Sequence, residues 1–355
     1  MVSIVTAVLV LSFMIFIHEL GHFLAAKKAG VGVEKFSIGF GPRLWGFRRG
    51  ETEYLLSAVP FGGYVKMVGD NPEEEVQDPE KSFLLKSVWR RMATVIAGPV
   101  SNLLSAVVII YFVSMAGVPA LLAIVGTVQE DFPAAAAGLR SGDRIVAIDG
   151  KEIGTWDELT EIVHGSAGEE RKFAVQRDGE ELVFAITPRA SSTQNIFREE
   201  VTVGLVGITP AGDYTTLRYG PVAALGKSLE WTSTMIGLTV VSVGKIFQGI
   251  VPAKEIGGPL MIVQMTGKQA ELGLLNLLYL VAYISVALGV FNLFPIPILD
   301  GGHLLFFAIE ALRGKPLSVR KRELLQQVGL VILIALMLFA TKNDIFRIFG
   351  EVKGP

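Results

Sequence analysis

The chain has 355 residues, a formal net charge of −2 and no cysteine, and 51% of its residues are hydrophobic. With a mean hydropathy of +0.50, this composition is too apolar for a soluble protein of this length and predicts membrane-spanning helices. The near-neutral charge argues against a nucleic-acid-binding protein, which would carry a basic surface. The lack of cysteine excludes disulfides, thiolate nucleophiles and cysteine-based zinc sites, so any metal must be held by other side chains.

Four segments are apolar enough to cross a bilayer, for which about 20 residues are needed. They are residues 1–26, 92–117, 272–300 and 324–341. The first segment has no basic start and no small-residue cleavage site, so we expect a retained span instead of a removed signal peptide. A further apolar stretch, residues 231–251, contains Lys245 and several small polar residues. We interpret it as an amphipathic helix at the membrane surface.

The segments between these spans differ in charge. Residues 27–91 and 301–323 carry an excess of Lys and Arg, whereas residues 118–271 carry an excess of Asp and Glu. Basic loops near the ends of spans stay in the cytoplasm. The pattern therefore predicts that the two basic segments are cytoplasmic, and that residues 118–271 and the tail, residues 342–355, lie outside.

Two of these segments have the character of folded domains. Residues 27–91 contain strand-like runs such as VEKFSI and GYVKMV, broken by glycine and proline, which predict a β-hairpin followed by an acidic loop. Residues 118–190 contain PAAAAGLRSGDRIVAIDG, where a short helix precedes a turn, a strand and an Asp-Gly turn. We expect a small α+β domain there, followed over residues 191–271 by a linker and amphipathic helices.

The first span contains three ionisable residues in the pattern HExxH. His18 and His22 are four residues apart, so on a helix they share one face and can bind one ion. Glu19 lies beside the first histidine, where it can act as the general base of a zinc peptidase. A satisfied pair of core histidines is the alternative. Ionisable groups within a span are costly to bury, which favours the metal site.

A catalytic zinc needs three protein ligands and an open position. Asp300 is the only acidic residue from position 272 to position 308. With four spans, the first and third run in the same direction, so Asp300 reaches the depth of the two histidines. A fifth span at residues 231–251 would place it on the opposite face. His303 is the rival third ligand, and a polar residue at the start of a helix is the structural alternative.

Three motifs together, HELGH, NLFPIPILDGG and PAAAAGLRSGDRIVAIDG, resemble the site-2 protease family. The resemblance is to the bacterial RseP-like intramembrane zinc metalloproteases with a single PDZ domain. The shorter motifs GFGP, GGYVKM, AGPVSN and GGP extend it over nearly the whole chain. It implies a polytopic α-helical membrane protein with a cytoplasmic-side, membrane-associated β-element and an extracytoplasmic α+β PDZ domain. The implied location is the bacterial inner membrane.

The resemblance also implies an activity and a site. Zn²⁺ would be held by His18, His22 and Asp300, with Glu19 as the catalytic residue. The expected substrates are single-span membrane proteins cleaved in regulated intramembrane proteolysis, such as anti-sigma factors or signal-peptide remnants. The expected partners are these substrates and the lipid bilayer, with peptide or substrate contact through the PDZ domain and no nucleic acid.

Substrate contact is expected at polar or proline positions of the spans, at two loop glycines and along one strand. These residues are Asn102, Asn292, Pro295, Gly39, Gly41, Gly62, Gly63, Tyr64, Val65, Lys66 and Met67. The structural alternatives are an interhelical hydrogen bond for the asparagines, a helix kink for the proline and a packed hairpin for the strand.

Two other functions compete with the protease. One is an inactive membrane-anchored PDZ scaffold, which the intact HExxH and LDG motifs disfavour. The other is a different membrane metallopeptidase of the prenyl-protein type, which uses a glutamate as its third ligand on a later helix. Glu310 and Glu323 are the candidates for that ligand, and neither lies in a suitable motif.

Overall fold

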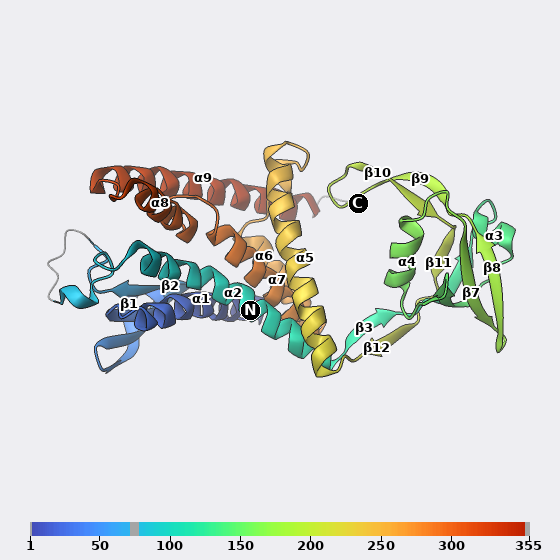
Figure 1. The fold of residues 1–355 in the computed structure, drawn as a ribbon, viewed down its shortest axis with the longest axis horizontal. Coiled ribbons are helices and arrows are strands. Elements are labelled where there is room, and N and C mark those ends of the chain that lie inside the picture. Colours follow the sequence, from blue (N-terminus) through green and yellow to red (C-terminus); the bar gives the residue numbers. More distant parts are fainter. Residues whose placement is uncertain (1, 72–77, 352–355) are drawn as a thin grey trace. The chain divides into compact units, whose positions relative to one another are not determined.

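The computed structural model of the chain describes residues 2–71 and 78–351. Most of the predicted acidic loop, residues 72–77, lies outside the described residues. The chain forms two compact units (Figure 1). A helical unit contains the residues up to 113, residues 221–244 and the residues from 252 onward, and a β-rich unit contains residues 114–220 and 245–251.

The helical unit contains one β-hairpin and a set of helices, most of them long. Its elements are α1 Val2–Lys28, β1 Val33–Arg49, β2 Thr52–Met67, α2 Val88–Ala116, most of α5 Pro221–Phe247, α6 Pro259–Glu271, α7 Leu274–Asn292, α8 Asp300–Arg313 and α9 Val319–Glu351.

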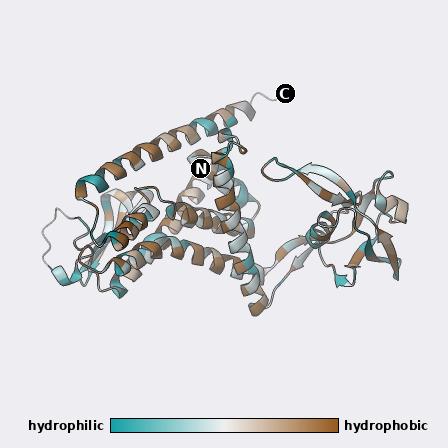
Figure 2. Ribbon diagram, turned by 45° about the horizontal axis from the view of Figure 1, so that its top comes forward, coloured by the Kyte–Doolittle hydropathy of each residue, from teal (hydrophilic) through white to brown (hydrophobic). Residues whose placement is uncertain are grey.

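Within the described part of the chain, four helices are long and apolar enough to cross a membrane, as predicted: α1, α2, α7 and α9. Their outward faces are apolar (Figure 2). Only 11% of the most apolar stretch of α9 is buried within the protein, so most of its leucine and isoleucine side chains need lipid around them. The chain is a membrane protein.

The stretch after α7 differs from the prediction of a span to residue 300 and a loop over residues 301–323. α7 ends at Asn292, because Pro295 and Pro297 follow and proline disfavours helix at and before its own position. A new helix, α8, begins at Asp300 within the predicted loop. α9 extends well beyond predicted residues 324–341, since its flanking Arg, Lys and Glu residues are good helix formers.

The predicted hairpin is present as the antiparallel pair β1–β2. Its base is anchored, because Val33, Phe36 and Met67 are buried, and Val33 and Met67 pack in one cluster with residues of α1, α2 and α8. Its far part is not covered: Leu44 and Trp45 are 67% and 62% exposed. The hairpin therefore joins the helices at one end and presents apolar side chains at the other.

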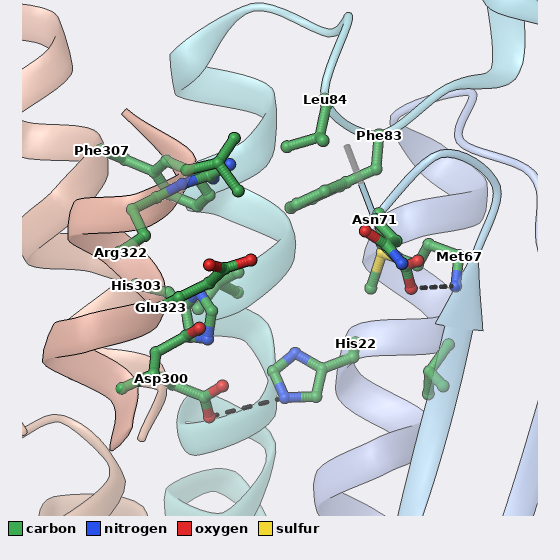
Figure 3. A pocket seen from close by; sticks show the side chains of 15 residues that line it. His22, Met67, Asn71, Phe83, Leu84, Asp300, His303, Phe307, Arg322 and Glu323 are labelled. Atoms are coloured by element: carbon green, nitrogen blue, oxygen red, sulfur yellow. Dashed lines mark hydrogen bonds and ion pairs between the residues drawn. The ribbon is translucent and has the colours of Figure 1, made fainter. Parts of the chain in front are cut away.

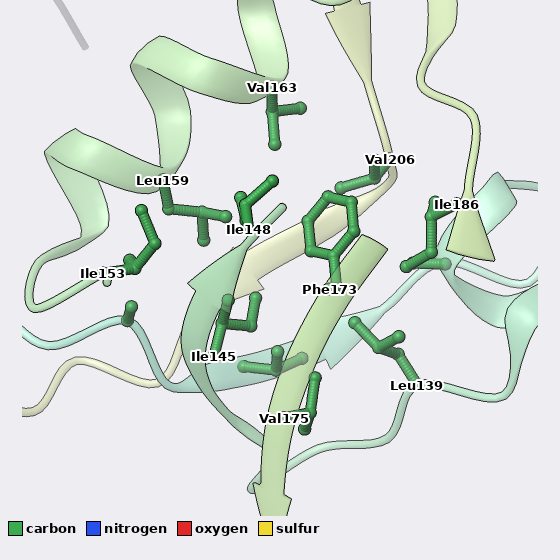
Figure 4. Packing of buried hydrophobic residues seen from close by; sticks show 13 residues of the cluster. Leu139, Ile145, Ile148, Ile153, Leu159, Val163, Phe173, Val175, Ile186 and Val206 are labelled. Atoms are coloured by element: carbon green, nitrogen blue, oxygen red, sulfur yellow. The ribbon is translucent and has the colours of Figure 1, made fainter. Parts of the chain in front are cut away.

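The β-rich unit has one four-stranded sheet and three two-stranded pairs among its described residues. The sheet has the order β6-β5-β7-β8, and Phe173, Ile145 and Leu159 pack in a core between this sheet and α4 (Figure 4). Thr155 and Glu158 form a capping box that starts α4. Its elements are β3 Val118–Leu121, β4 Val125–Val128, α3 Pro133–Ala137, β5 Arg144–Ile148, β6 Lys151–Glu152, α4 Trp156–His164, β7 Arg171–Arg177, β8 Glu180–Ile186, β9 Arg189–Gln194, β10 Glu200–Leu205, β11 Ile208–Pro210 and β12 Tyr214–Leu217.

This unit is longer than the predicted domain, residues 118–190. β10 pairs with β9, β11 with β4 and β12 with β3, so the strands up to Leu217 supply the hydrogen-bond partners of the first strands. The predicted linker therefore begins only after residue 220. The ambiguous stretch, residues 231–251, lies largely in α5, which is not among the four candidate spans. α5 packs on α2 and α7 through Trp231, Met235 and Ile236.

Candidate metal centre

Three side chains from opposite ends of the sequence converge at one point. His18 Nε2 lies 3.1 Å and His22 Nε2 lies 3.5 Å from Asp300 Oδ2. The two Nε2 atoms are 3.2 Å apart, and one ligand atom from each residue lies within 4.8 Å of the others. Among the described residues, this is the group of His, Asp and Glu side chains that could hold a metal ion.

The donor set fits zinc. Asp300 Oδ2 is buried and makes no hydrogen bond of acceptable geometry to any described residue. A carboxylate oxygen and two imidazole nitrogens facing one another, without a cation, leave buried lone pairs uncompensated. Two histidines and one carboxylate are a common ligand set of catalytic zinc, and they leave a fourth position open.

Helix α1 places both imidazoles on the same face, and α2 comes close enough to hold them. Gly98 of α2 faces the ring of His22: a methyl group at Gly98 would lie 2.3 Å from His22 Nε2. Gly21 of α1 lies as close to α2, since a methyl there would be 2.3 Å from Ala97 O. His22 Nδ1 donates to Thr94 O at 3.0 Å, which leaves Nε2 of this ring free to bind an ion.

The third ligand stands at the start of α8. Gly301 and Gly302 let this helix pack directly on the irregular segment before it. A methyl group at Gly301 would lie 2.1 Å from Phe294 O, and one at Gly302 would lie 2.4 Å from Ile296 O. The positive end of the helix dipole stabilises the carboxylate of Asp300. This packing explains why the motif has two glycines directly after the aspartate.

Glu19 is partly buried and lies beside β2. A methyl group at Gly63 would lie 3.0 Å from Glu19 Cγ and 3.1 Å from Ile15 Cγ2, so the strand approaches α1 closely at this glycine. Gly62 faces Phe40 in the same way, and Tyr64 stacks on Phe40 with ring centroids 6.2 Å apart. The strand predicted to contact the substrate therefore passes next to the predicted catalytic residue.

A cavity of about 430 Å³ is lined by two of the three converging side chains, His22 and Asp300. Figure 3 shows His22 and Asp300 facing each other at one end of it, with His303, Arg322 and Glu323 on the same side as Asp300. His303 lines the cavity but is not among the three side chains that converge. The rival ligand is therefore near the site, without a place in the cluster.

The predicted substrate residues are spread around the site. Val65 and Met67 line the cavity, whereas Lys66 forms an ion pair with Glu34 at 3.3 Å. Gly39 and Gly41 have φ values of +90° and +83°, which glycine adopts without strain, and they shape an irregular part of β1.

The remaining candidates belong to the helices. Asn292 is half-buried as the last residue of α7, and Pro295 is exposed in the segment after it. Asn102 is fully buried, and its side chain amide lies 3.3 Å from His18 Nδ1. Burial of Asn102 favours a role in holding the histidine over one in contacting the substrate.

One ion pair that no sequence pattern predicts fixes α8 against α2. Arg91 donates from Nη1 and Nη2 to the two carboxylate oxygens of Glu310, at 3.1 Å and 2.5 Å. The guanidinium also lies over the ring of Phe307, 4.8 Å from its centroid. Arg91 and Glu310 are 219 positions apart, and no local pattern in the sequence links them.

The chain is similar to known proteins over almost its whole length. The model of "Peptidase family M50" matches residues 6–336. The zinc metalloprotease RasP of Geobacillus kaustophilus is 30% identical over 424 residues, covering 98% of this chain and 98% of that protein. An Agrobacterium fabrum protein named as a zinc metalloprotease, Atu1380, is 37% identical over 366 residues, covering 98% and 96% of the two chains.

Among solved structures, the PDZ domain of the SdrC-like protein from Listeria monocytogenes is similar to a part of the chain. It is 25% identical and covers 24% of this chain and 84% of that domain, with a TM-score of 0.20. The family match, by contrast, spans both the HExxH motif and the LDG motif. The chain belongs to peptidase family M50, the site-2 protease family, and is a zinc metalloprotease.

Proposed function

We propose that the chain is an intramembrane endopeptidase that cleaves single-span membrane proteins, with zinc held by His18, His22 and Asp300. The observation that carries the proposal is the convergence of these three side chains, within 4.8 Å, between helices that could cross a membrane. An enzyme with its metal at this position acts on peptide bonds that lie in or beside the bilayer.

Zinc, when bound, acts as a Lewis acid and makes water a nucleophile at neutral pH. Glu19 accepts the proton of the attacking water and later delivers it to the nitrogen of the leaving amine. The backbone oxygen of Thr94 orients the ring of His22 by accepting a hydrogen bond from its Nδ1–H, and Gly98 makes room for that ring. The open cavity beside Asp300 gives water and the carbonyl of the substrate access to the site.

The hairpin is the element that we assign to substrate capture. A transmembrane helix hides its peptide groups in internal hydrogen bonds, so it must unwind before cleavage. The β1–β2 sheet has no third strand among the described residues, and β2 passes Glu19 at Gly63. An unwound substrate strand that adds to β2 would bring its backbone next to Glu19. Gly39, Gly41 and residues 62–67 would then contact the substrate.

The exposed far part of the hairpin supports its position at a membrane surface. Leu44, Trp45 and Phe47 are exposed there, close in sequence to Arg43 and Arg48. Aromatic and basic side chains together are typical of the membrane interface. We place this element on the cytoplasmic side, because the segment that contains it has an excess of basic residues.

We assign the β-rich unit to the extracytoplasmic side, as a PDZ-type domain that contacts peptides or substrates. It has a cavity of about 230 Å³ between α4 and the chain at residues 205–208, lined by Trp156, Leu159 and Val163 of the helix. The apolar lining suits a hydrophobic side chain of an extended peptide. By the same topology the protein is a multi-pass protein of the bacterial inner membrane.

Cleavage of a labelled single-span protein by the detergent-purified chain tests this function. Glu19→Gln should lower the rate by at least about 10²-fold and still retain zinc, because it removes the general base and no ligand. Glu271→Gln, at an exposed position at the end of α6, is the matched control and should cleave at the wild-type rate. A zinc chelator should stop the reaction.

Cleavage that survives both Glu19→Gln and the chelator would rule out the proposal. A wild-type protein that binds zinc and the substrate but cleaves nothing would favour the scaffold. Cleavage that is restricted to prenylated peptides would favour the other class of membrane metallopeptidase.

A further inference from the structure

We propose that Asn102 is a positioning residue whose side chain oxygen accepts a hydrogen bond from Nδ1–H of His18. This bond keeps the proton of His18 on Nδ1 and leaves Nε2 free for the metal. The inference rests on the proposed role of His18 as a ligand. It assigns to Asn102 a place behind the site, since its exposed fraction is 0% and no substrate can reach it.

Both histidines face Asp300 with Nε2, so each must present this nitrogen to an ion held there. An imidazole that binds a metal through Nε2 carries its proton on Nδ1 and needs an acceptor there. For His22 this acceptor is Thr94 O, at 3.0 Å, and a carbonyl oxygen can only accept. The tautomer of His22 is therefore fixed by the backbone of α2.

For His18 the corresponding polar contact is Asn102. Its Nδ2 lies 3.3 Å from His18 Nδ1, while its buried Oδ1 has no partner among the described residues. In this orientation the amide donates, Nδ1 accepts and the proton of His18 sits on Nε2. That proton would point into the space shared with Asp300 Oδ2 and His22 Nε2, where the ion must lie.

A half turn of the amide about its last bond exchanges oxygen and nitrogen at nearly the same positions. Each orientation gives the amide one hydrogen bond to His18, so the amide alone does not decide between them. The metal does, because only the turned amide is compatible with an unprotonated Nε2 on His18. We infer that the zinc-bound protein has Asn102 Oδ1 at His18 Nδ1.

Asn102 is held rigidly enough to do this. Its backbone oxygen accepts from Ser105 Oγ at 2.8 Å and from Ser285 Oγ at 3.0 Å, and the two hydroxyls are 2.8 Å apart. Ser285 belongs to α7 and is fully buried. These bonds hold the backbone of α2 against α7 at the residue whose side chain contacts His18.

The test is the zinc affinity of the full-length, detergent-purified protein, measured by competition with a chromogenic chelator. Asn102→Leu should bind zinc about 10- to 100-fold more weakly, as expected when the partner of a ligating histidine is lost. Asn102→Asp should keep or exceed the wild-type affinity, because a carboxylate can only accept. Asn276→Leu is the control and should leave the affinity unchanged, because the exposed side chain of this α7 asparagine donates to Leu272 O, just before the helix.

Wild-type zinc affinity in a folded Asn102→Leu protein would overturn the proposal. If that variant fails to fold, Asn102→Asp decides: an affinity at least tenfold weaker means that the amide must donate, and this also overturns it. His18→Ala separates this failure from failure of the ligand assignment. If His18→Ala binds zinc as the wild type does, the ligand set is wrong, whatever Asn102 does.

Discussion

Replacing Gly98 by alanine tests how closely α2 supports the metal site. The added methyl would lie 2.3 Å from Nε2, 2.5 Å from Cε1 and 2.9 Å from Cδ2 of His22, whereas ordinary contact begins near 3.4 Å. The ring would have to move by about 1 Å to relieve the clash, although it is held by Thr94 O. A displacement of about 1 Å at a reacting centre costs about 10²-fold in rate.

We therefore expect Gly98→Ala to lower both the zinc affinity and the rate of substrate cleavage, the rate by about 100-fold. Chelator competition and the labelled-substrate assay measure the two effects. Gly237→Ala is the matched control: this glycine also lies within a helix, but its added methyl meets no atom within 4 Å. It should retain activity and gain up to about 1 kcal/mol of stability from helix propensity. Wild-type zinc affinity and activity in Gly98→Ala would refute the reasoning.

Two further predictions concern stability. Arg91→Met leaves the carboxylate of Glu310, whose side chain is 17% exposed, without its partner, so we expect a loss of up to about 3 kcal/mol in the free energy of unfolding. Burial alone would raise the pKa of Asp143, but Arg177 and the backbone N–H of Arg140 outweigh it and hold the pKa below its usual value. The stabilisation is then fully present above the unfolded-state pKa, about 3.9, and is lost as the pH falls through the native pKa. Thermal unfolding of the β-rich unit at stepped pH should show this loss, and Asp143→Asn should flatten it.

Each of these predictions has a control within the chain. Lys227→Met breaks an exposed ion pair with Glu230 and should cost less than about 1 kcal/mol. If Arg91→Met lowers the free energy of unfolding no more than Lys227→Met does, the Arg91–Glu310 pair contributes no more stability than an exposed ion pair. An acid-induced loss of stability that is the same in wild type and Asp143→Asn would show that the buried carboxylate is not its source.

The parts of the site that lie on one helix turn could be read from the sequence. The helical repeat alone predicts that His18 and His22 share one face. Asp300 is predicted as a metal ligand because it is an isolated acidic residue in an apolar stretch. The hairpin was also predictable, because its strand-like runs and glycines are local signals. The four candidate spans follow from length and hydropathy in the same way.

The contacts that hold the site together could not be read in this way. Gly98 and Thr94 act on His22 from another helix, 72 positions away in the case of Thr94, and nothing local marks them. α8 was predicted as a loop because the pattern offered no apolar repeat of span length there. Two of the strands after residue 190, β11 and β12, were missed because each is short and gains its stability from pairing with a distant strand.

The central claim is that two distant parts of the chain hold one zinc ion, and metal binding by two variants tests it most directly. Zinc content after dialysis against a chelator should be compared for the wild type, Asp300→Asn and His303→Ala. We predict that Asp300→Asn loses its zinc while His303→Ala, changed three residues further along the same helix, retains it. Retention of zinc by Asp300→Asn at the wild-type level, or its loss in His303→Ala alone, would contradict the account.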